Sequence, residues 1–340
     1  MHALVWEGPR RLVLADVADP VPGPEDALLR VRGAGICGSE LEGYLGQSSL
    51  RVPPLVMGHE FSGEIVWLPP DNTTGLHVGQ LVTANPLIPC GMCRICQAGR
   101  PYLCPRRRLI GAHRPGAFAE YVAVPLDALI PLPEMLDAPL GALSEPLAVA
   151  LHAVARARLQ ASAAAVVWGA GSIGLLTIWA ARLAGADPIV AVETNPARLA
   201  AAAALGAGVT VDGRDPDAIA AVRRAVAEHP FVTVFDAVGR WMTRCAAVQA
   251  ADPGGQVVLI GLHDSETTFA VNALVRAEIT LVCAYGYTHA ELQRAVEMLA
   301  AEALPTTSWI EVRPLAAGPA AFGELIDAPG AVTKVVLAPA

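Results

Sequence analysis

Four cysteines lie within a segment of fifteen residues, and no other feature of the sequence constrains the fold as strongly. The segment is dense in glycine, proline and arginine. Two spacings of two residues and a longer loop let four thiolates converge on one tetrahedral zinc ion. A redox role for one Cys-x-x-Cys pair is the alternative, but it would leave two thiols unexplained. The sequence therefore predicts a loop folded around a structural zinc by Cys90, Cys93, Cys96 and Cys104.

Length and composition exclude several classes of protein. A chain of 340 residues with 54% hydrophobic residues has enough apolar surface for two cores. The net charge of −8, with no run of like charges, argues against nucleic-acid binding and favours small-molecule ligands. Seven cysteines are an odd count, and the segment Met1–Arg11 has no apolar secretory core. We therefore expect no disulfide framework and a reducing, cytoplasmic location.

The second half of the chain alternates short apolar strands with alanine-rich helices. This rhythm is typical of βαβ units that build a parallel sheet. Six such strands predict a doubly wound sheet. The predicted strands are Ala164–Trp168, Ile189–Glu193, Val209–Asp212, Val232–Asp236, Val257–Gly261 and Ile279–Cys283.

One stretch, Leu159–Ala181, has no charged residue and is long enough to cross a bilayer. Three glycines interrupt it where the first strand would turn into the helix Ser172–Ala184. We therefore expect a buried strand and its crossover helix in a soluble protein. A further helix, Asn195–Leu205, is predicted from Thr194 or Asn195 as its cap and a proline in its first turn.

The first 145 residues are predicted to form an irregular, mostly β domain. Short β-runs separated by proline and glycine include Ala27–Val31, Phe61–Trp67, Gln80–Ala84 and Ala119–Val124.

Beyond Tyr285 the alternation stops, leaving a helix at His289–Glu302 and a β-tail at Thr333–Leu337. These elements are too few for a third domain, so we expect them to return to the first. The predicted division is a first domain of residues 1–146, a nucleotide-binding domain of residues 147–285, and a returning segment of residues 286–340.

The GAGSIG turn at residues 169–174 has the context of a dinucleotide-binding fingerprint. Gly169 permits the tight turn, Gly171 lets a pyrophosphate approach the backbone, and Gly174 lets helix and strand pack closely. Glu193 follows Gly174 by 19 residues, where a carboxylate binds ribose hydroxyls and repels a 2′-phosphate. NAD is therefore favoured over NADP, although Arg198 weakens that preference. Ser172 and Ile173 complete the predicted cofactor turn.

A second cluster of candidate metal ligands is Cys37, His59 and Glu60, with Glu145 further along the chain. A catalytic zinc needs three protein ligands and one open position, and these residues offer soft, borderline and hard donors. Their spacing alone is weak support, since a buried cysteine and a hydrogen-bonded histidine are common in protein cores.

Together these segments resemble the zinc-dependent medium-chain dehydrogenases, the alcohol and polyol dehydrogenase superfamily. The motifs GHEFSG, the cysteine loop, GAFAEYV, EPLAVALHA, GAGSIGLL and VTKVVL occur in the family's order across nearly the whole chain. The resemblance implies a GroES-like catalytic domain, a Rossmann domain and an active site in the cleft between them. It also implies two zinc ions per subunit, a structural zinc in the cysteine loop and a catalytic zinc at Cys37 and His59.

The resemblance also suggests residue roles. Glu60 and Glu145 resemble the carboxylates of the branch that contains sorbitol, threonine and galactitol-phosphate dehydrogenases; which of them contacts zinc is open, and Glu145 could simply begin a helix. Ser39 falls where the family has the hydroxyl that takes the alcohol proton, or it is a turn residue. Segments resembling those that border the nicotinamide, or else belonging to the core, contain Ile260, Gly261, Leu262 and Tyr285.

The sequence departs from the family's pattern near Ser39. Many relatives have Asp and then His where this chain has Glu40 and Glu42, and that histidine commonly ends the proton relay. Glu42 could accept the proton, ribose and water could serve alone, or a charged substrate could change the need. His113 and Arg114 could bind an acidic or phosphorylated substrate, or lie in an exposed loop.

The expected function is a zinc-dependent hydride transfer between a secondary alcohol, such as a polyol or cyclitol, and NAD. Sugar-alcohol phosphates or threonine are alternative substrates on the same mechanism, and a zinc-independent quinone or enoyl reductase is a remote alternative. The resemblance also implies a homodimer or homotetramer, because such dehydrogenases pair their Rossmann domains through sheet edges, and the apolar strand Ile279–Cys283 is the expected interface edge. Cys245 and Cys283 are expected to be buried.

Overall fold

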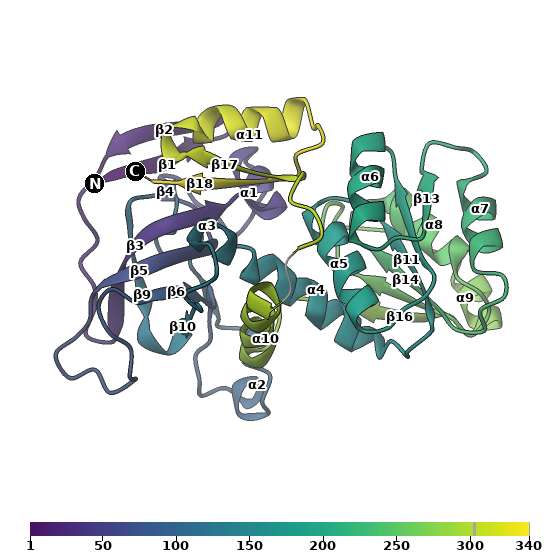
Figure 1. The fold of residues 1–340 in the computed structure, drawn as a ribbon, viewed down its shortest axis with the longest axis horizontal. Coiled ribbons are helices and arrows are strands. Elements are labelled where there is room, and N and C mark those ends of the chain that lie inside the picture. The colour runs from purple at the N-terminus through teal and green to yellow at the C-terminus, as the bar shows by residue number, and fades with distance from the viewer. Residues whose placement is uncertain (302–303, 340) are drawn as a thin grey trace. The chain divides into compact units, whose positions relative to one another are not determined.

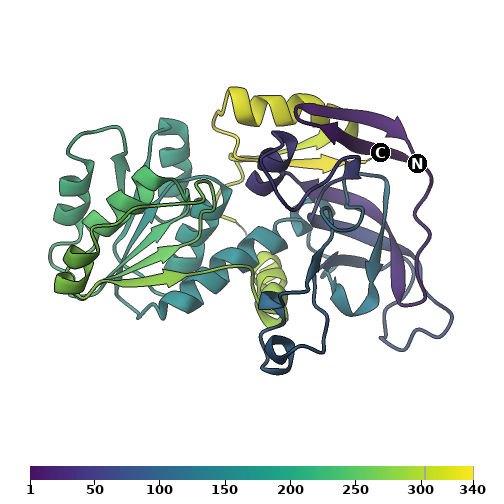
Figure 2. The same ribbon diagram turned by 180° about the vertical axis from the view of Figure 1, so that it is seen from behind.

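The computed structural model describes residues 1–301 and 304–339, which divide into two compact units. The first unit comprises Met1–Glu145, Thr288–Ala303 and Ile310–Ala340, and the second comprises Pro146–Tyr287 and Leu304–Trp309. Figures 1 and 2 show these units from opposite sides. Each unit has its own cluster of buried apolar side chains.

The second unit is built on a six-stranded sheet with the order β13-β12-β11-β14-β15-β16. Every neighbouring pair of strands is parallel. The strand order reverses between β11 and β14, which lie side by side in the middle of the sheet. All residues of β11 are buried, as expected for a central strand covered on both faces. The strands are β11 (Ala164–Trp168), β12 (Ile189–Glu193), β13 (Val209–Asp212), β14 (Val232–Asp236), β15 (Gln256–Leu259) and β16 (Thr280–Cys283). The doubly wound parallel sheet is confirmed.

Helices cover both faces of this sheet (Figures 1 and 2). Contacts pair α5 with α6 and α7 with α8. The helices are α5 (Ser172–Leu183), α6 (Pro196–Leu205), α7 (Ala218–Ala225), α8 (Trp241–Ala250) and α9 (Val271–Ala277). The predicted cap of α6 is confirmed as Asn195, whose side chain accepts hydrogen bonds from the amides of Ala197 and Arg198. The stretch that imitates a membrane span is the strand β11 followed by the helix α5.

Three details of the second unit differ from the prediction. The strand β15 ends at Leu259, because the amides of Ile260 and Gly261 both turn to the main-chain oxygen of Asp236 at 3.0 Å. A helix of seven residues, α9, precedes the last strand of this sheet. The sequence did not predict it, because so short a segment shows no clear hydrophobic periodicity. Cys283 is exposed and Cys245 half-buried, so the expectation that both are buried is wrong. Cys283 lies on β16, an edge strand that covers less of the core.

The first unit is mainly antiparallel β. Its largest sheet has the order β10-β6-β5-β3-β18-β17, with β9 also paired to β3, and a smaller sheet has the order β2-β1-β4. The strands are β1 (His2–Gly8), β2 (Arg11–Asp16), β3 (Asp26–Gly35), β4 (Leu55–Val56), β5 (Glu60–Trp67), β6 (Leu81–Ala84), β7 (Leu87–Ile88), β8 (Arg108–Leu109), β9 (Tyr121–Pro125), β10 (Leu129–Pro131), β17 (Ile310–Pro314) and β18 (Lys334–Ala338).

The end of the chain supplies strands to this unit. Because β18 pairs with β3, residues about 300 positions apart lie side by side, with Val336 opposite Gly35. The helices here are α1 (Gly38–Tyr44), α2 (Arg94–Gln97), α3 (Ala138–Gly141), α4 (Ser144–Ala157), α10 (His289–Ala301) and α11 (Gly318–Asp327). The helix α4 continues into the second unit. The predicted end of α10, Glu302, lies outside the described residues.

Within the described parts of the chain, residues 138–157 are the one helical stretch that is long and apolar enough to cross a membrane by length and composition. The stretch is 67% buried inside the protein, as the core helix of a soluble protein also is.

Candidate metal centres and active site

The four cysteines of the loop converge in space. Their sulfur atoms all lie within 4.8 Å of one another, and Cys93 Sγ is 3.4 Å from Cys96 Sγ and 3.8 Å from Cys104 Sγ. A tetrahedron of sulfurs at about 2.3 Å from zinc has edges of about 3.8 Å. The short helix α2 begins after Cys93 and brings Cys96 back toward it. The residues therefore fit a closed four-thiolate zinc site, which has no open position for a substrate.

Neighbouring donors favour a thiolate at one corner of this site. The guanidinium of Arg106 donates to Cys90 Sγ at 3.3 Å. Burial raises the pKa of Cys90, but hydrogen bonds from the amides of Met92 and Cys93 and from Cys104 lower it to about 6. Burial and the neighbouring thiols raise the pKa of Cys96 to about 12. Without a metal the four sulfurs are thus unequal, and a bound dication is what would make all four thiolates.

The second cluster comes from two segments at the ends of neighbouring strands of one sheet. Cys37 caps the N-terminus of α1 directly after β3, and His59 and Glu60 lie at the start of β5, which pairs with β3. One ligand atom from each of these three residues lies within 4.8 Å of the others. One thiol, one imidazole and one carboxylate are a donor set suited to zinc with an open position. These residues therefore fit a catalytic rather than a structural zinc.

Glu40 fixes the orientation of His59, a role that the sequence reasoning missed. Its Oε1 accepts from His59 Nδ1 at 2.8 Å and from the amides of Gly58 and His59, and its Oε2 accepts from the amide of Cys37 at 3.0 Å. The carboxylate is fully buried. Because Nδ1 is held in this way, Nε2 is the ring nitrogen left for a metal.

The Glu40 contact also changes the acidity of both groups. Burial lowers the pKa of His59, but the charge of Glu40 and hydrogen bonds with Cys37 and Glu40 raise it well above its usual value. Burial likewise raises the pKa of Glu40, while the charges of His59 and Arg51 bring it below its usual value. A metal must therefore displace a proton from His59 before it binds there.

The carboxylate of Glu60 is paired with a buried cation from the end of the chain. Lys334 Nζ lies 2.5 Å from Glu60 Oε2 and donates to the main-chain oxygen of Ile36 at 2.9 Å. Lys334 is 2% exposed and Glu60 is 1% exposed. Burial lowers the pKa of Lys334, but the charge of Glu60 raises it above its usual value. No sequence signal links these two residues, because 274 positions separate them.

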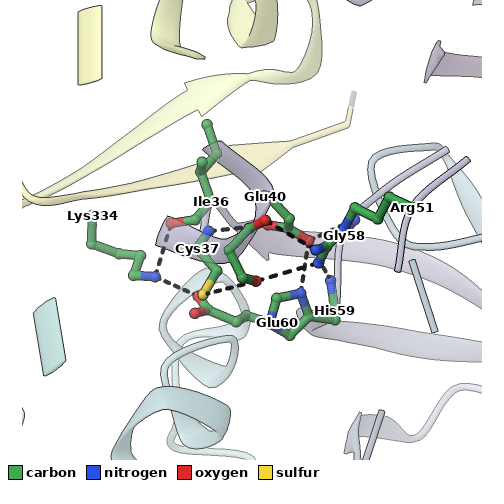
Figure 3. Close-up of polar contacts among 9 residues, drawn as sticks. Ile36, Cys37, Glu40, Arg51, Gly58, His59, Glu60 and Lys334 are labelled. Carbon is green, nitrogen blue, oxygen red and sulfur yellow. Dashed lines mark hydrogen bonds and ion pairs between the residues drawn. The ribbon is translucent and has the colours of Figure 1, made fainter. Parts of the chain in front are cut away.

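Ser39 lies beside the cluster and has two polar neighbours. Its hydroxyl donates to Cys37 Sγ at 3.6 Å, and Arg51 donates to both the Ser39 hydroxyl and the Ser39 carbonyl. Figure 3 shows Lys334 and Arg51 on opposite sides of the cluster. Arg51 was not among the predicted site residues, since a single arginine in a loop carries no sequence signal.

The remaining predicted polar residues lie elsewhere or have other partners. Glu145 is buried in the first turn of α4, and Glu42 is half-buried on α1. Arg114 pairs with the carboxylate of Asp26 at 3.0 Å and donates to a main-chain oxygen. His113 Nδ1 accepts from the amide of Leu109. The charge of Arg114 is therefore neutralised within the protein, which weakens its candidacy as a substrate anion site.

The glycine turn of the second unit has the shape that a dinucleotide needs. Gly169 adopts a φ of 92°, which favours glycine, and a Cβ at Gly174 would collide with the main-chain oxygen of Gly169. A Cβ at Gly171 would meet no atom of the described residues within 4 Å, so the backbone is open there. Ser172 and Ile173 follow at the N-terminus of α5, where amides attract phosphates.

Glu193 is held against this turn. Its Oε2 accepts from the amide of Ala170 at 2.8 Å, and its Oε1 accepts from the amides of Thr194 and Asn195. Arg198 follows, half-buried, in the first turn of α6. The structure thus brings the carboxylate and the glycines together, as the fingerprint predicts.

The predicted nicotinamide-bordering residues follow two adjacent strands. Ile260 and Gly261 come directly after β15, and Leu262 is 65% exposed. Tyr285 comes after β16, where the amide of Ala284 donates to Leu259. All of them therefore lie at the carboxyl ends of parallel strands, where α/β sheets bind ligands.

Comparison with known proteins identifies the family. The model of the alcohol dehydrogenase GroES-like domain matches residues 23–134, and that of the zinc-binding dehydrogenase matches residues 172–301. L-galactonate-5-dehydrogenase of Escherichia coli K12 is 32% identical over 300 residues, covering 88% of this chain and 87% of that protein.

Two solved structures are similar along their whole length. A zinc-binding dehydrogenase from Sinorhizobium meliloti 1021 bound to NADP has a TM-score of 0.91 and 32% identity, with 99% of both chains covered. Galactitol-1-phosphate dehydrogenase from Escherichia coli has a TM-score of 0.92 and 27% identity, with 100% of both chains covered.

The chain belongs to the zinc-binding alcohol dehydrogenase family, as the resemblance implied. It is a zinc-dependent oxidoreductase that transfers a hydride between a CH–OH group of a small-molecule alcohol and a nicotinamide cofactor. The predicted GroES-like and Rossmann fold class is confirmed.

Proposed function

We propose that this enzyme oxidises a secondary hydroxyl of a polyhydroxylated small molecule at the cluster of Cys37, His59 and Glu60, with NAD as the preferred acceptor. The observation that carries this proposal is the convergence of these three ligands within 4.8 Å, with the histidine oriented by the buried Glu40. Zinc held there would polarise the substrate oxygen as a Lewis acid. The relatives named for galactonate and galactitol phosphate support a polyhydroxylated substrate.

Ser39 is the proposed acceptor of the alcohol proton. Arg51 Nη2 donates to the Ser39 hydroxyl at 3.3 Å, so the hydroxyl oxygen is held in place while its own proton points toward the cluster. The side of Ser39 facing Arg51 offers no acceptor, because a guanidinium only donates. Ser39 would take the alcohol proton on its oxygen and release its own hydroxyl proton, which would turn from Cys37 Sγ toward the cofactor ribose, water or Glu42 on the same helix.

We propose Glu60 and Glu145 as the two candidates for the carboxylate ligand of the catalytic zinc. Lys334 neutralises much of the charge of Glu60, which weakens Glu60 as a permanent zinc ligand. Glu145, buried at the start of α4, is then the candidate for the third ligand. In the cysteine loop, the residues Cys90, Cys93, Cys96 and Cys104 are proposed to hold the structural zinc.

The preference for NAD rests on Glu193. Its carboxylate is fixed at the glycine turn, where it would accept ribose hydroxyls and repel a 2′-phosphate. Arg214 is a nearby cation, but Asp212 holds it at 2.7 Å, so its charge is already paired. The NADP-bound relative makes a direct test necessary: Glu193→Ala should raise kcat/KM for NADP relative to NAD, and an enzyme that already prefers NADP would contradict the proposal.

A homodimer or homotetramer in the cytoplasm is also proposed. The edge strand β16 carries Leu281, 37% exposed, beside the exposed Val271 and Val275 of α9. Pairing two copies through this edge would cover them. All seven cysteines are free, which suits a reducing compartment. Light scattering of the wild type and of Leu281→Lys would test the assembly, and a monomeric wild type would rule it out.

The experiment that tests the main function measures NAD and NADP reduction with polyols, cyclitols, aldonates, alditol phosphates and simple secondary alcohols, with and without a zinc chelator. We expect chelator-sensitive reduction of NAD on a polyhydroxylated substrate. Reduction confined to simple alcohols, or unaffected by removal of zinc, would overturn the proposal.

A further inference from the structure

The side chain of Arg51 is a buried cation that forms no ion pair within 4.0 Å with a residue that the structure describes. It is 4% exposed, although Leu50 and Val52 beside it are 49% and 73% exposed. The ion pairs within 4.0 Å in this cluster are those of His59 with Glu40 and of Lys334 with Glu60, and Arg51 takes part in neither. Its Nε is buried and has no hydrogen-bond partner among the described residues.

The neighbouring helix makes room for this guanidinium. A Cβ at Gly43 would lie 2.7 Å from Arg51 Cδ and 3.3 Å from Met57 Sδ. Gly43 lies near the end of α1, where alanine would be the better helix former. The absence of a side chain at Gly43 thus lets Arg51 turn inward from an otherwise exposed loop and reach Ser39.

A purely structural role does not explain the charge. The two hydrogen bonds of Arg51 go to the carbonyl and the hydroxyl of Ser39, which are both neutral groups. A buried cation is costly unless an anion and hydrogen bonds compensate it. The charge of Arg51 lowers the pKa of the Glu40 carboxyl, so Glu40 compensates part of this cost, but Glu40 is already bound to His59 and to three backbone amides.

The position of Arg51 links it to the reacting group. Its Nη2 is 3.3 Å from the hydroxyl of Ser39, and that hydroxyl is 3.6 Å from Cys37 Sγ. A substrate whose hydroxyl reacts beside Ser39 would therefore place a neighbouring substituent within reach of the guanidinium. The Nε hydrogen and the second hydrogen of Nη2 remain as donors for that substituent.

We propose that Arg51 binds a carboxylate of the substrate, so that this dehydrogenase acts on sugar-derived hydroxy acids in preference to neutral polyols. The inference rests on the proposed function and names the substrate class of that same site. A planar guanidinium matches a carboxylate through two parallel hydrogen bonds. Arg51 is then a specificity-determining residue, and the carboxylate of the substrate is its ion-pair partner.

A phosphate fits this site less well. A phosphate monoester carries nearly two negative charges near neutral pH, and Arg51 is one cation. The other buried cation, Lys334, is already paired with Glu60. A singly charged carboxylate matches the single charge of Arg51, whereas a phosphate dianion would exceed it.

The test compares matched substrates on matched variants. C5 and C6 aldonates are assayed beside the alditols of the same configuration and the alditol 1-phosphates, with the zinc-loaded enzyme and NAD. The variants are Arg51→Gln, which removes the charge and leaves a shorter neutral donor, Arg51→Lys, which keeps charge without the planar fork, and Gly43→Ala. Thermal unfolding of each variant reports whether the fold is retained.

We expect the wild type to prefer an aldonate over its alditol. Loss of a hydrogen-bonded charge should lower kcat/KM for the aldonate about 10- to 100-fold in Arg51→Gln, mostly through KM, and much less for the alditol. Arg51→Lys should recover part of the loss. Gly43→Ala keeps the cation but displaces it, so it should lower the aldonate preference in a folded protein.

The possible failures are distinguishable. Equal losses of kcat/KM on aldonate and alditol in Arg51→Gln would mean that Arg51 only positions Ser39. A wild type that prefers alditols or their phosphates would also overturn the inference. Both outcomes leave the proposed function intact. If no substrate is oxidised, the binding of aldonates to the wild type and to Arg51→Gln is measured by calorimetry. Binding that needs Arg51 would support the anion site and refute the proposed reaction. Absence of binding would overturn the inference.

Discussion

The two candidate metal clusters belong to the same structural unit but are assembled in opposite ways. The cysteine loop draws four identical ligands from fifteen consecutive residues, with an arginine as the charged neighbour of one sulfur. The other cluster draws three different ligands from two segments and is held by buried charges on Glu40 and Lys334. The ligands of the first lie in a single loop, whereas the second is supported by the surrounding sheet.

This difference separates stability from reactivity. A zinc ion held by four thiolates would tie down a loop that has little core of its own, and the metal would contribute to folding directly. The cluster at Cys37 is supported from behind by hydrogen bonds that remain without a metal, which leaves an open position for chemistry. Substitutions in the two clusters should therefore affect different measurements.

The largest effect is expected for Cys37→Ala on activity. Loss of a zinc ligand removes Lewis-acid activation worth several kcal/mol, so kcat should fall roughly 10³-fold or more. The melting temperature should change little, because β3 and α1 remain packed. Steady-state kinetics and thermal unfolding of the same preparation check both claims, and a variant that retains activity would show that the cluster is not the active site.

Cys104→Ser should have the opposite profile. Its sulfur is the fully buried one of the four, and loss of one thiolate should release zinc and unfold the loop at a cost of several kcal/mol. Metal content and chemical denaturation measure this effect. Cys245→Ser is the matched control, since that half-buried thiol lies in the second unit and donates to the main-chain oxygen of Thr268. Similar losses in both variants would contradict a structural zinc.

Breaking the buried pair of Glu60 and Lys334 should destabilise the first unit next most. Lys334→Met leaves the carboxylate buried and unpaired, at a cost of about 3–5 kcal/mol. The double variant Glu60→Gln with Lys334→Met removes both charges and should recover part of that loss. Denaturation curves of the two single variants and the double variant form the test. Additive losses would show that the pair is not coupled.

Glu40→Gln should weaken zinc binding at the Cys37 cluster by about 10- to 100-fold, because the His59 ring loses the carboxylate that orients it. Competition with a chromogenic chelator measures this affinity. Glu64→Gln is the matched control: it removes a carboxylate paired with Arg32 in the same sheet but away from the cluster. Unchanged affinity in Glu40→Gln would contradict the orienting role.

The sequence predicted the cysteine loop almost completely, because its ligands are close in the chain and their spacing determines the chemistry. It also predicted five of the six Rossmann strands within one residue at each end, where valine-rich runs are bounded by glycine and charged residues. Cys37, His59 and Glu60 were singled out by their residue types, and the family resemblance strengthened their interpretation as zinc ligands, since their spacing alone was weak support.

The supporting residues of the second cluster could not be predicted in the same way. Glu40 was identified only as a departure from the family's aspartate, and its four hydrogen bonds depend on how β5 pairs with β3. Lys334 meets Glu60 only because β18 returns to β3 from the end of the chain. Arg51 reaches Ser39 only because Gly43 lacks a side chain. Long-range pairing and packing, rather than local pattern, determine these contacts.

The smallest predicted effect concerns the metal-free cysteine loop. Since hydrogen bonds lower the pKa of Cys90 to about 6 and the surroundings raise that of Cys96 to about 12, Cys90 should be largely thiolate at pH 7 and Cys96 protonated. Thiolates are the reactive form, so after removal of zinc Cys90 should alkylate first, with a rate that rises between about pH 5 and 7. Mass spectrometry of the labelled peptides measures the order. Zinc should suppress labelling of all four cysteines, while Cys283, exposed on β16, stays reactive with or without metal. Equal labelling of the four cysteines at pH 7 would contradict this prediction. It would mean that the loop loses its shape when the metal is removed, unlike the Cys37 cluster, which the surrounding sheet supports.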